Sequence, residues 1–518
     1  MQNELPQFAA ILLITACISM SMDVILLNSG PEDLGRISPY RTLGAYKIAH
    51  YTRAAGYETQ VIDHLMFLSE EQLRACMLKF VTNETLAIGV STTFMRDPSR
   101  PFNESSLPVH IINVLNEISE QFPNVKLIFG GYGTSLVTST RSTTDFIKKP
   151  YATIQQYGED TFVDVLNHLR GTGPEPAWTI SKVTPGGPYN KMIKQYNGPI
   201  TTRFNIETDA FQFTKNDAVM PNETLPIEIS RGCIFKCKFC NHLMLGRGKL
   251  DYLRDFELVR NELMHNYEQW GTTNYYVICD TFNDTEYKMK EWHKMVTSLP
   301  FKINWTSYLR ADLLHRFPDV PYMLAETGLF SCFHGIETFG EHASQVIGKG
   351  WSGKSAREFL PKLYHDIWKE EIFQTLSFIV GLPGDTAESI LETGKWFNSN
   401  KMYNIAWHTL GIQQNSARNA SEFERNAESY GYTFTETNGW KNEHWTTETA
   451  AEFVKKKLGP LNGPNNAKHG SWKIMQLKQF GYTHQHFQKK NNIFWNIQDQ
   501  YVRGQAFINN YVARLLDL

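Results

Sequence analysis

The sequence of 518 residues has few cysteines, almost no net charge and no long hydrophobic run. Seven cysteines are no disulfide framework in a chain of this length, which indicates a reducing compartment. A net charge of −2 provides no broad basic field that would attract nucleic acid or anionic lipid. No internal repeat or long low-complexity tract is visible. We therefore expect a cytoplasmic globular protein of two to four domains that binds neither nucleic acid nor a membrane.

The only apolar stretch that resembles a targeting signal runs from Phe8 to Met22. It is too short for a comfortable membrane-spanning helix. It also lacks the positive region of a signal peptide and carries Glu4 instead. We interpret residues 1–22 as an N-terminal extension. A helix packed on the fold, or translation starting at Met20 or Met22, are the alternatives.

Residues 23–172 alternate short apolar runs with segments of helical spacing. The expected strands are residues 23–28, 58–63, 86–90, 125–129 and 152–156. The expected helices are residues 43–55, 70–80, 109–122 and 161–169. This alternation predicts an α/β domain with a doubly wound, Rossmann-like sheet, in which ligands bind beyond the carboxyl ends of the strands.

Small polar residues and glycines stand where these strands end. The candidate ligand-binding residues are Ser29, Ser91, Thr92, Gly130, Gly131, Gly158 and Glu159. The glycines would let a large ligand approach the backbone, although glycine after a strand is also ordinary turn chemistry. No GxGxxG motif is present, so a dinucleotide is not expected.

The second half of the chain begins after a region rich in Gly, Pro, Thr and Asn at residues 173–222, which we interpret as a linker. Residues 223–412 alternate again. The expected strands are residues 227–230, 274–279, 303–308, 331–336, 374–380 and 405–411. The expected helices are residues 253–269, 286–299, 318–327, 355–369 and 386–398. Six such units can curl into a partial TIM-like (β/α)6 barrel. The aromatic-rich residues 413–518 predict a mainly helical cap near the substrate.

Three of the cysteines form a CxxxCxxC pattern directly after the first strand of this barrel, at Cys233, Cys237 and Cys240. A 4Fe-4S cluster needs one ligand for each iron, so three thiolates leave one iron open to a small molecule. Zinc with His242 as a fourth ligand is the alternative. The remaining cysteines are expected to be buried free thiols. They are Cys17, Cys76, Cys279 and Cys332.

These motifs together resemble those of the radical S-adenosylmethionine (SAM) superfamily. An aromatic residue, Phe239, precedes the third cysteine, and four further motifs follow at successive strand ends. They are Asp-Thr-Phe-Asn-Asp at 280–284, Tyr-Leu-Arg at 308–310, Gly-Ile-Glu-Thr at 335–338 and Phe-Ile-Val-Gly-Leu-Pro-Gly-Asp-Thr at 378–386. The last is similar to the Gly-x-Pro-Gly-Glu-Thr stretch of the superfamily, with Asp385 in place of Glu.

The resemblance implies that the cysteines hold a 4Fe-4S cluster whose open iron chelates SAM. Reductive cleavage would give a 5′-deoxyadenosyl radical that abstracts hydrogen from a small-molecule or peptide substrate. The implied electron donor is a protein such as flavodoxin or ferredoxin. The implied SAM-binding residues are Phe239, Asp280, Arg310, Glu337, Gly381 and Pro383. Structural alternatives are a helix cap for Asp280, an Arg310–Glu337 ion pair, and a plain turn at Gly381 to Gly384.

A Rossmann-like domain ahead of such a barrel is similar to the cobalamin-binding subfamily. The matching positions are Leu43-Gly44, Gly130-Gly131 and Gly158-Glu159-Asp160. The sequence departs from it after the first strand. There Asn28-Ser29-Gly30-Pro31 stands in place of the Asp-x-His-x-x-Gly loop that supplies a histidine to cobalt, which many members also lack.

This second resemblance implies cobalamin-dependent methyl transfer to an unactivated carbon. A radical SAM enzyme without cobalamin would instead catalyse rearrangement, cyclisation or sulfur insertion. A zinc-stabilised binding protein is the non-enzyme alternative. No residue is predicted to be catalytic, and the substrate is open.

Overall fold

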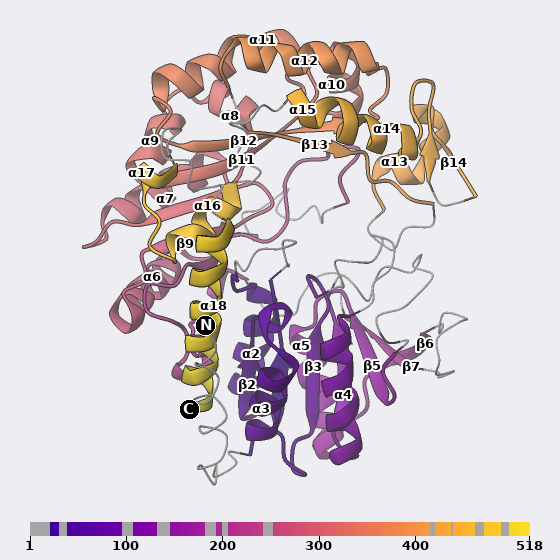
Figure 1. Cartoon of the computed structure of the whole chain (residues 1–518), viewed down its shortest axis with the longest axis vertical. Helices are drawn as coiled ribbons and strands as arrows, with labels where there is room; N and C mark the ends of the chain where they lie inside the picture. Colours follow the sequence, from indigo (N-terminus) through magenta and orange to yellow (C-terminus); the bar gives the residue numbers. More distant parts are fainter. Residues whose placement is uncertain are drawn as a thin grey trace, which may run out of the picture.

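Two parallel β-sheets form the framework of the protein in this computed structural model (Figure 1). The structure describes residues 21–30, 39–95, 107–131, 144, 146–181, 193–198, 206–241, 252–402, 404–414, 420–436, 439–461, 471–487 and 497–518. The predictions for residues 1–20, including Cys17, and for His242 lie outside these residues. Among the described residues, no helix is both long and apolar enough to cross a membrane.

The N-terminal sheet has seven strands in the order β2-β1-β3-β4-β5-β7-β6. The strands are β1 (Val24–Leu27), β2 (Thr59–Ile62), β3 (Ala87–Ser91), β4 (Lys126–Gly130), β5 (Pro150–Gln155), β6 (Trp178–Ser181) and β7 (Ile193–Asn197). The helices are α2 (Leu43–Ala54), α3 (Glu70–Phe80), α4 (Val109–Gln121) and α5 (Glu159–Arg170). Helices α2 and α5 contact each other, as do α3 and α4. The doubly wound prediction is confirmed.

The predicted linker over residues 173–222 needs correction. Strand β7 pairs in parallel with β5, and β6 pairs antiparallel with β7, so the N-terminal sheet continues to Asn197. Strand β6 forms the edge of the sheet and β7 lies next to it. Both mix polar with apolar side chains, as in Ile193-Lys-Gln-Tyr-Asn197. A half-exposed edge strand carries little of the continuous apolar signal that marks the central strands.

The second sheet has six parallel strands that neighbour each other in sequence order. They are β8 (Leu225–Glu228), β9 (Asn274–Ile278), β10 (Asn304–Leu309), β11 (Leu329–Glu337), β12 (Phe373–Val380) and β13 (Ile405–Thr409). The helices between them are α6 (Phe256–Trp270), α7 (Glu286–Thr297), α8 (Ala311–Arg316), α9 (Val320–Glu326), α10 (Glu341–Ile347), α11 (Gly353–Pro361) and α12 (Ala387–Ser399). The expected partial barrel is confirmed.

Side chains alternate across the barrel wall as a period of two requires. Tyr275 and Val277 of β9 belong to the core that includes Trp292 of α7, whereas Tyr276 packs with Met475 of the C-terminal region. The helices therefore cover one face of the sheet, and part of the C-terminal region covers the other. Short 3₁₀ or π turns complete the chain. They are η1 (Leu65–Phe67), η3 (Ile206–Thr208), η4 (Lys215–Asp217), η5 (Lys362–Ile367), η6 (Ala427–Tyr430) and η7 (Val454–Leu458).

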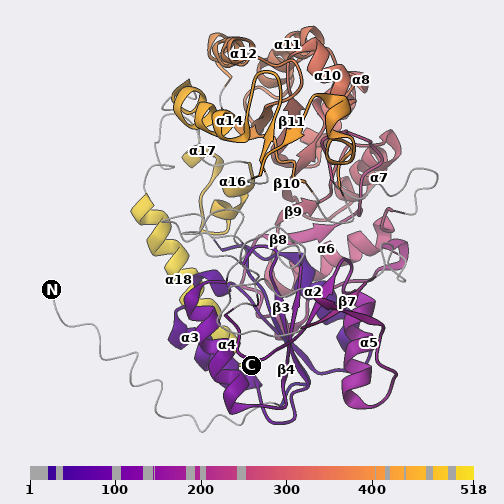
Figure 2. The ribbon, with the colours of Figure 1, turned by 90° about the vertical axis from the view of Figure 1, so that its right-hand side faces the viewer.

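The C-terminal region is mainly helical, as predicted, but it is not only a cap on the barrel. Its elements are α13 (Glu422–Arg425), β14 (Thr433–Phe434), β15 (Trp440–Lys441), α14 (Thr447–Phe453), α15 (Gly459–Leu461), α16 (Ser471–Lys478), α17 (His484–Phe487) and α18 (Ile497–Leu516). Helix α16 contacts β9, β10 and β11. Helix α18 instead runs beside α3 of the N-terminal domain (Figures 1 and 2), where Ile508 and Leu515 join its core.

The two sheets share one hydrophobic core, which runs from Leu43 and Phe162 of the N-terminal domain to Leu225 and Val259 of the barrel. A fully buried ion pair lies beside this core. Arg41 Nε donates to Glu223 Oε1 over 2.7 Å, with neither side chain exposed. The barrel is thus fixed against the face of the N-terminal sheet that α2 and α5 cover.

A buried histidine in the barrel predicts acid sensitivity. His334 on β11 is fully buried, with Nε2 3.2 Å from Gln374 Oε1 and no partner for Nδ1. Burial lowers its pKa from 6.5 to about 4. The unfolded chain binds the proton first as pH falls, so the free energy of unfolding is unaffected above pH 6.5 and drops between pH 6.5 and pH 4.

We expect His334→Gln to reduce the acid-induced decrease in the free energy of unfolding by up to about 3 kcal/mol. Urea denaturation of the wild type and the variant between neutral and mildly acidic pH measures the two slopes. Identical slopes would show that His334 does not bind a proton differently in the folded and unfolded states.

Candidate functional site

The cysteine loop begins where β8 ends. Gly232 adopts a φ of +90°, a backbone conformation that only glycine tolerates easily. The chain turns at this residue, and Cys233 comes directly after the turn. Cys233, Cys237 and Cys240 are half-buried and form no disulfide, whereas Cys76, Cys279 and Cys332 are buried as predicted. The three loop cysteines thus keep their sulfurs available as ligands.

Polar groups of the loop and of neighbouring strand ends approach two of these sulfurs. Thr281 Oγ1, after β9, is 3.5 Å from Cys233 Sγ, and the backbone N–H of Phe235 donates to the same sulfur over 3.5 Å. Arg310 Nη1, after β10, is 3.5 Å from Cys237 Sγ. Burial raises the pKa of the Cys233 thiol despite these contacts, so a metal that binds here would have to displace the thiol proton.

A buried lysine of α7 contacts the chain on both sides of the cysteine loop, at the ends of β8 and β9. Lys288 Nζ donates to Ser230 Oγ over 2.9 Å and to the carbonyl of Thr281 over 3.1 Å, and it pairs with Asp284 at 3.2 Å. Ser230 Oγ in turn lies 3.1 Å from Cys279 Sγ. The ends of β8 and β9 are therefore linked to the first turn of α7.

Two of the predicted SAM-binding residues have different partners from those considered above. Arg310 pairs with Asp312, at 2.7 Å, and Glu337 pairs with Lys349, at 3.0 Å. The alternative of an Arg310–Glu337 ion pair is therefore wrong. Glu337 has a φ of +72°, which is strained for a residue other than glycine.

Asp280 is exposed at the end of β9, and the helix that follows is capped by Thr285, which accepts from Lys288 N. The alternative of a helix cap for Asp280 is therefore wrong. Phe239 is partly buried against the core near the end of β12, and Pro383 is half-buried.

The Gly381 carbonyl is already occupied by two donors, because Tyr432 Oη and Asn442 Nδ2 donate to it over 2.8 and 3.0 Å. A Cβ at Gly381 would lie 2.2 Å from the ring of Trp440. This glycine is thus required for packing of the C-terminal region. Trp440 and Trp445 are buried and belong to the hydrophobic core of this region.

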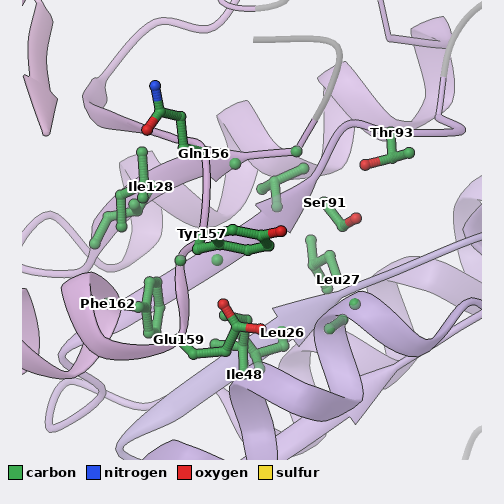
Figure 3. A pocket seen from close by; sticks show the side chains of 18 of the residues that line it. Leu26, Leu27, Ile48, Ser91, Thr93, Ile128, Gln156, Tyr157, Glu159 and Phe162 are labelled. Carbon is green, nitrogen blue, oxygen red and sulfur yellow. The ribbon is translucent and has the colours of Figure 1, made fainter. Parts of the chain in front are cut away.

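A cavity of about 360 Å³ lies at the carboxyl ends of the N-terminal strands, on the side of α2 and α5 (Figure 3). Apolar side chains and five glycines form much of its lining. In the close view, Ser91 and Thr93 lie on one side, Ile128 and Phe162 on the other, and Tyr157 between them. The cavity is large enough for part of a sizeable organic ligand.

Five of the seven residues predicted for this ligand site line the cavity. They are Ser91, Gly130, Gly131, Gly158 and Glu159. Ser29 and Thr92 do not line it, because each hydroxyl is bonded within the fold: Ser29 Oγ accepts from Met66 N, and Thr92 Oγ1 donates to the Gly130 carbonyl. Neither orientation can be deduced from position in the chain.

Five further polar residues that the sequence did not predict for this site also line the cavity: Thr93, Gln156, Tyr157, Glu228 and Arg231. Gln156 and Tyr157 follow β5 directly, so their place at a strand end was a usable signal. Arg231 belongs to the barrel, and no sequence pattern connects it with the N-terminal domain.

Arg231 joins the cavity to the cysteine loop. Its Nη1 donates to Glu159 Oε1 over 2.7 Å, and its Nε donates to Glu228 Oε1 over 2.8 Å. Burial alone would raise the pKa of Glu228, but Arg231 and Lys47 outweigh it and hold the pKa at about 2. Because Arg231 immediately precedes Gly232 and Cys233, the cavity and the cysteine loop share a wall.

The residues present fit a 4Fe-4S cluster, because three half-buried thiols stand on one loop. No three His, Cys, Asp or Glu side chains of the described residues could together hold one metal ion. In a 4Fe-4S cluster each thiolate binds a different iron, so the cysteines need not converge on one point. The lining of the N-terminal cavity, in the described part of the chain, includes no histidine.

Comparison with known proteins identifies the barrel. Residues 227–397 match the Radical SAM superfamily. This barrel is a radical SAM domain. A segment of 183 residues, 35% of the chain, is 25% identical to the anaerobic magnesium-protoporphyrin IX monomethyl ester cyclase of Cereibacter sphaeroides. That segment spans only 27% of the cyclase.

Solved structures of two other proteins have a fold similar to that of this chain, beyond the radical SAM domain. The radical SAM methyltransferase TsrM of Kitasatospora setae, with cobalamin and a 4Fe-4S cluster bound, superposes with a TM-score of 0.59 at 13% identity. The match covers 92% of this chain and 99% of TsrM. The cobalamin-dependent radical SAM enzyme OxsB superposes with a TM-score of 0.52 at 16% identity, over 74% of this chain and 52% of OxsB. The N-terminal sheet, the barrel and the helical region thus form an architecture similar to that of TsrM.

Proposed function

We propose that the protein is a cobalamin-dependent radical SAM methyltransferase acting on a small molecule or a peptide. The observation that carries the proposal is the shared wall. The cavity at the ends of the N-terminal strands touches Arg231, two residues before the first cysteine. A corrinoid in the cavity would therefore lie next to a cluster on the loop. The fold similarity to TsrM and OxsB supports the same reading.

When bound, the cluster and SAM supply one-electron bond cleavage, and cobalamin supplies a transferable methyl group. The residues of this chain position these groups. Cys233, Cys237 and Cys240 would bind three irons and leave the fourth for SAM. The glycines at the strand ends let the large cofactor approach the backbone. The apolar part of the lining would limit the access of water to the reacting groups.

Anaerobic purification tests the proposal most directly. We expect a brown protein with about four irons per chain that retains added hydroxocobalamin through gel filtration and consumes SAM when reduced. Protein that holds the cluster but no corrinoid would favour the alternative of a radical SAM enzyme without cobalamin. Stoichiometric zinc without iron would contradict both.

The cavity can be filled without disturbing the fold at Gly44. This residue lies in the first turn of α2 and lines the cavity, and nothing lies within 4 Å of a Cβ built on it. We expect Gly44→Leu to weaken cobalamin binding at least about ten-fold, because the side chain takes space that the ligand needs. Equilibrium titration of the absorbance spectrum measures the dissociation constant.

Gly459→Leu is the matched control, since Gly459 is an exposed glycine of α15 that does not line the cavity. Both variants should keep their iron. Equal cobalamin affinity of Gly44→Leu and the wild type would show that the corrinoid binds elsewhere.

A further inference from the structure

We infer that Arg310 is a positioning residue of the cysteine loop, whose guanidinium donates to the Cys237 thiolate and raises the reduction potential of the cluster. The inference rests on the proposed function, because it requires a cluster on the loop. It assigns Arg310 a role different from the binding of SAM that the sequence predicts.

The guanidinium is held in a fixed orientation. Its Nε and Nη2 donate to the two carboxylate oxygens of Asp312 over 3.1 and 2.7 Å, and Nη2 also donates to the carbonyl of Lys349 over 3.2 Å. Such a forked pair with a carboxylate fixes the plane of the group. Nη1 therefore points at Cys237 Sγ, 3.5 Å away.

The cysteine loop also packs on the guanidinium. The ring of Phe235 lies with its centroid 4.1 Å from Arg310 Cζ, which is a close cation–π contact. The backbone of Arg310 is fixed as well, because its N–H donates to Asn283 Oδ1 over 2.8 Å and its carbonyl accepts from Asn283 Nδ2 over 2.9 Å. The charge thus has little freedom to move away from the loop.

The electrostatic consequence follows from the burial of this charge. Arg310 is only 6% exposed, so solvent and salt screen its charge weakly. Reduction adds one electron to a cluster that already carries three thiolates. A nearby cation stabilises the reduced state more than the oxidised state, and donors to ligand sulfurs shift the potential in the same direction. Asp312 partly offsets the cation, because its carboxylate lies beside it.

Two substitutions test the inference with opposite expected signs. Arg310→Gln removes the cation and should move the midpoint potential to more negative values. The expected ratio of reduced to oxidised cluster at a fixed potential falls about ten-fold, which corresponds to about 59 mV for one electron. Asp312→Asn removes the offsetting carboxylate and should move the potential to more positive values. A redox titration monitored by electron paramagnetic resonance measures both.

Arg316→Gln is the control, because Arg316 is an exposed arginine at the end of α8, the helix that begins directly after Arg310. Its potential should equal that of the wild type. Clusters of Arg310→Gln and the wild type with the same potential would overturn the inference. If Arg310→Gln fails to hold a cluster, the test rests on Asp312→Asn. A midpoint potential of Asp312→Asn that equals or is more negative than that of the wild type then overturns the inference. Wild-type protein without iron would instead contradict the proposed function.

Discussion

Cys237→Ala is expected to abolish the iron–sulfur absorption of the protein and to lower SAM cleavage by at least about a thousand-fold. Each iron of a 4Fe-4S cluster needs its own ligand, so two cysteines cannot hold a cluster whose fourth iron is already without a protein ligand. Cys237 is half-buried on the loop after β8 and receives Arg310 as a donor. Iron analysis and an absorbance spectrum after anaerobic reconstitution measure the loss.

Cys76→Ala is the matched control for this experiment. Cys76 is a buried thiol in α3 of the N-terminal domain, so its replacement affects packing but not the loop. We expect the iron content and the spectrum of this variant to match the wild type. Cys237→Ala protein with full iron content would show that the loop does not hold the cluster in the way proposed.

The largest expected effect on stability comes from breaking the ion pair between the two sheets. Arg41 stands before α2 and donates to both oxygens of Glu223, which stands before β8, over 2.7 and 3.1 Å. Both side chains are fully buried. Glu223→Gln leaves the guanidinium without its counter-charge in the interior, and we expect the free energy of unfolding to fall by about 3–5 kcal/mol. Urea denaturation measures it.

A double-mutant cycle separates the ion pair from packing. Arg41→Met alone leaves the buried Glu223 carboxylate without its counter-charge. Arg41→Met together with Glu223→Gln removes both charges, and should lower the free energy of unfolding by less than the sum of the two single changes. Glu286→Gln is the control, because Glu286 pairs with Lys290 over 2.8 Å on an exposed helix face. That change should cost less than about 1 kcal/mol. Additive effects at Arg41 and Glu223 would contradict the pairing.

The two most informative residues between the domains are arginines with different partners. Arg41 holds Glu223 and the carbonyls of Asp217 and Ala218, and so fixes the segment that connects the two sheets. Arg231 holds Glu159 at the edge of the cavity. The first contact stabilises the arrangement of the domains, and the second places the cavity beside the cysteine loop.

The sequence by itself determined the features that depend on local periodicity and spacing. Val24–Leu27 is buried throughout and is a continuous apolar run, and the amphipathic helix Val109–Gln121 repeats its apolar residues with helical spacing. The spacing of Cys233, Cys237 and Cys240 is likewise a local property. The two α/β units, the partial barrel and the cysteine loop at its mouth could therefore be predicted.

Only the tertiary structure decided which groups meet. Asp312 and Glu337 both stand near strand ends. In the folded protein Asp312 forms an ion pair with Arg310, and Glu337 forms an ion pair with Lys349. The hydroxyl of Ser29 bonds to the backbone of Met66 and not into the cavity. Apart from the Arg310–Asp312 pair, which is local in the sequence, such contacts depend on distances and orientations between separate segments of the chain, and neither composition nor periodicity encodes them. For the same reason the wall that Arg231 forms between cavity and loop emerges only from the folded protein.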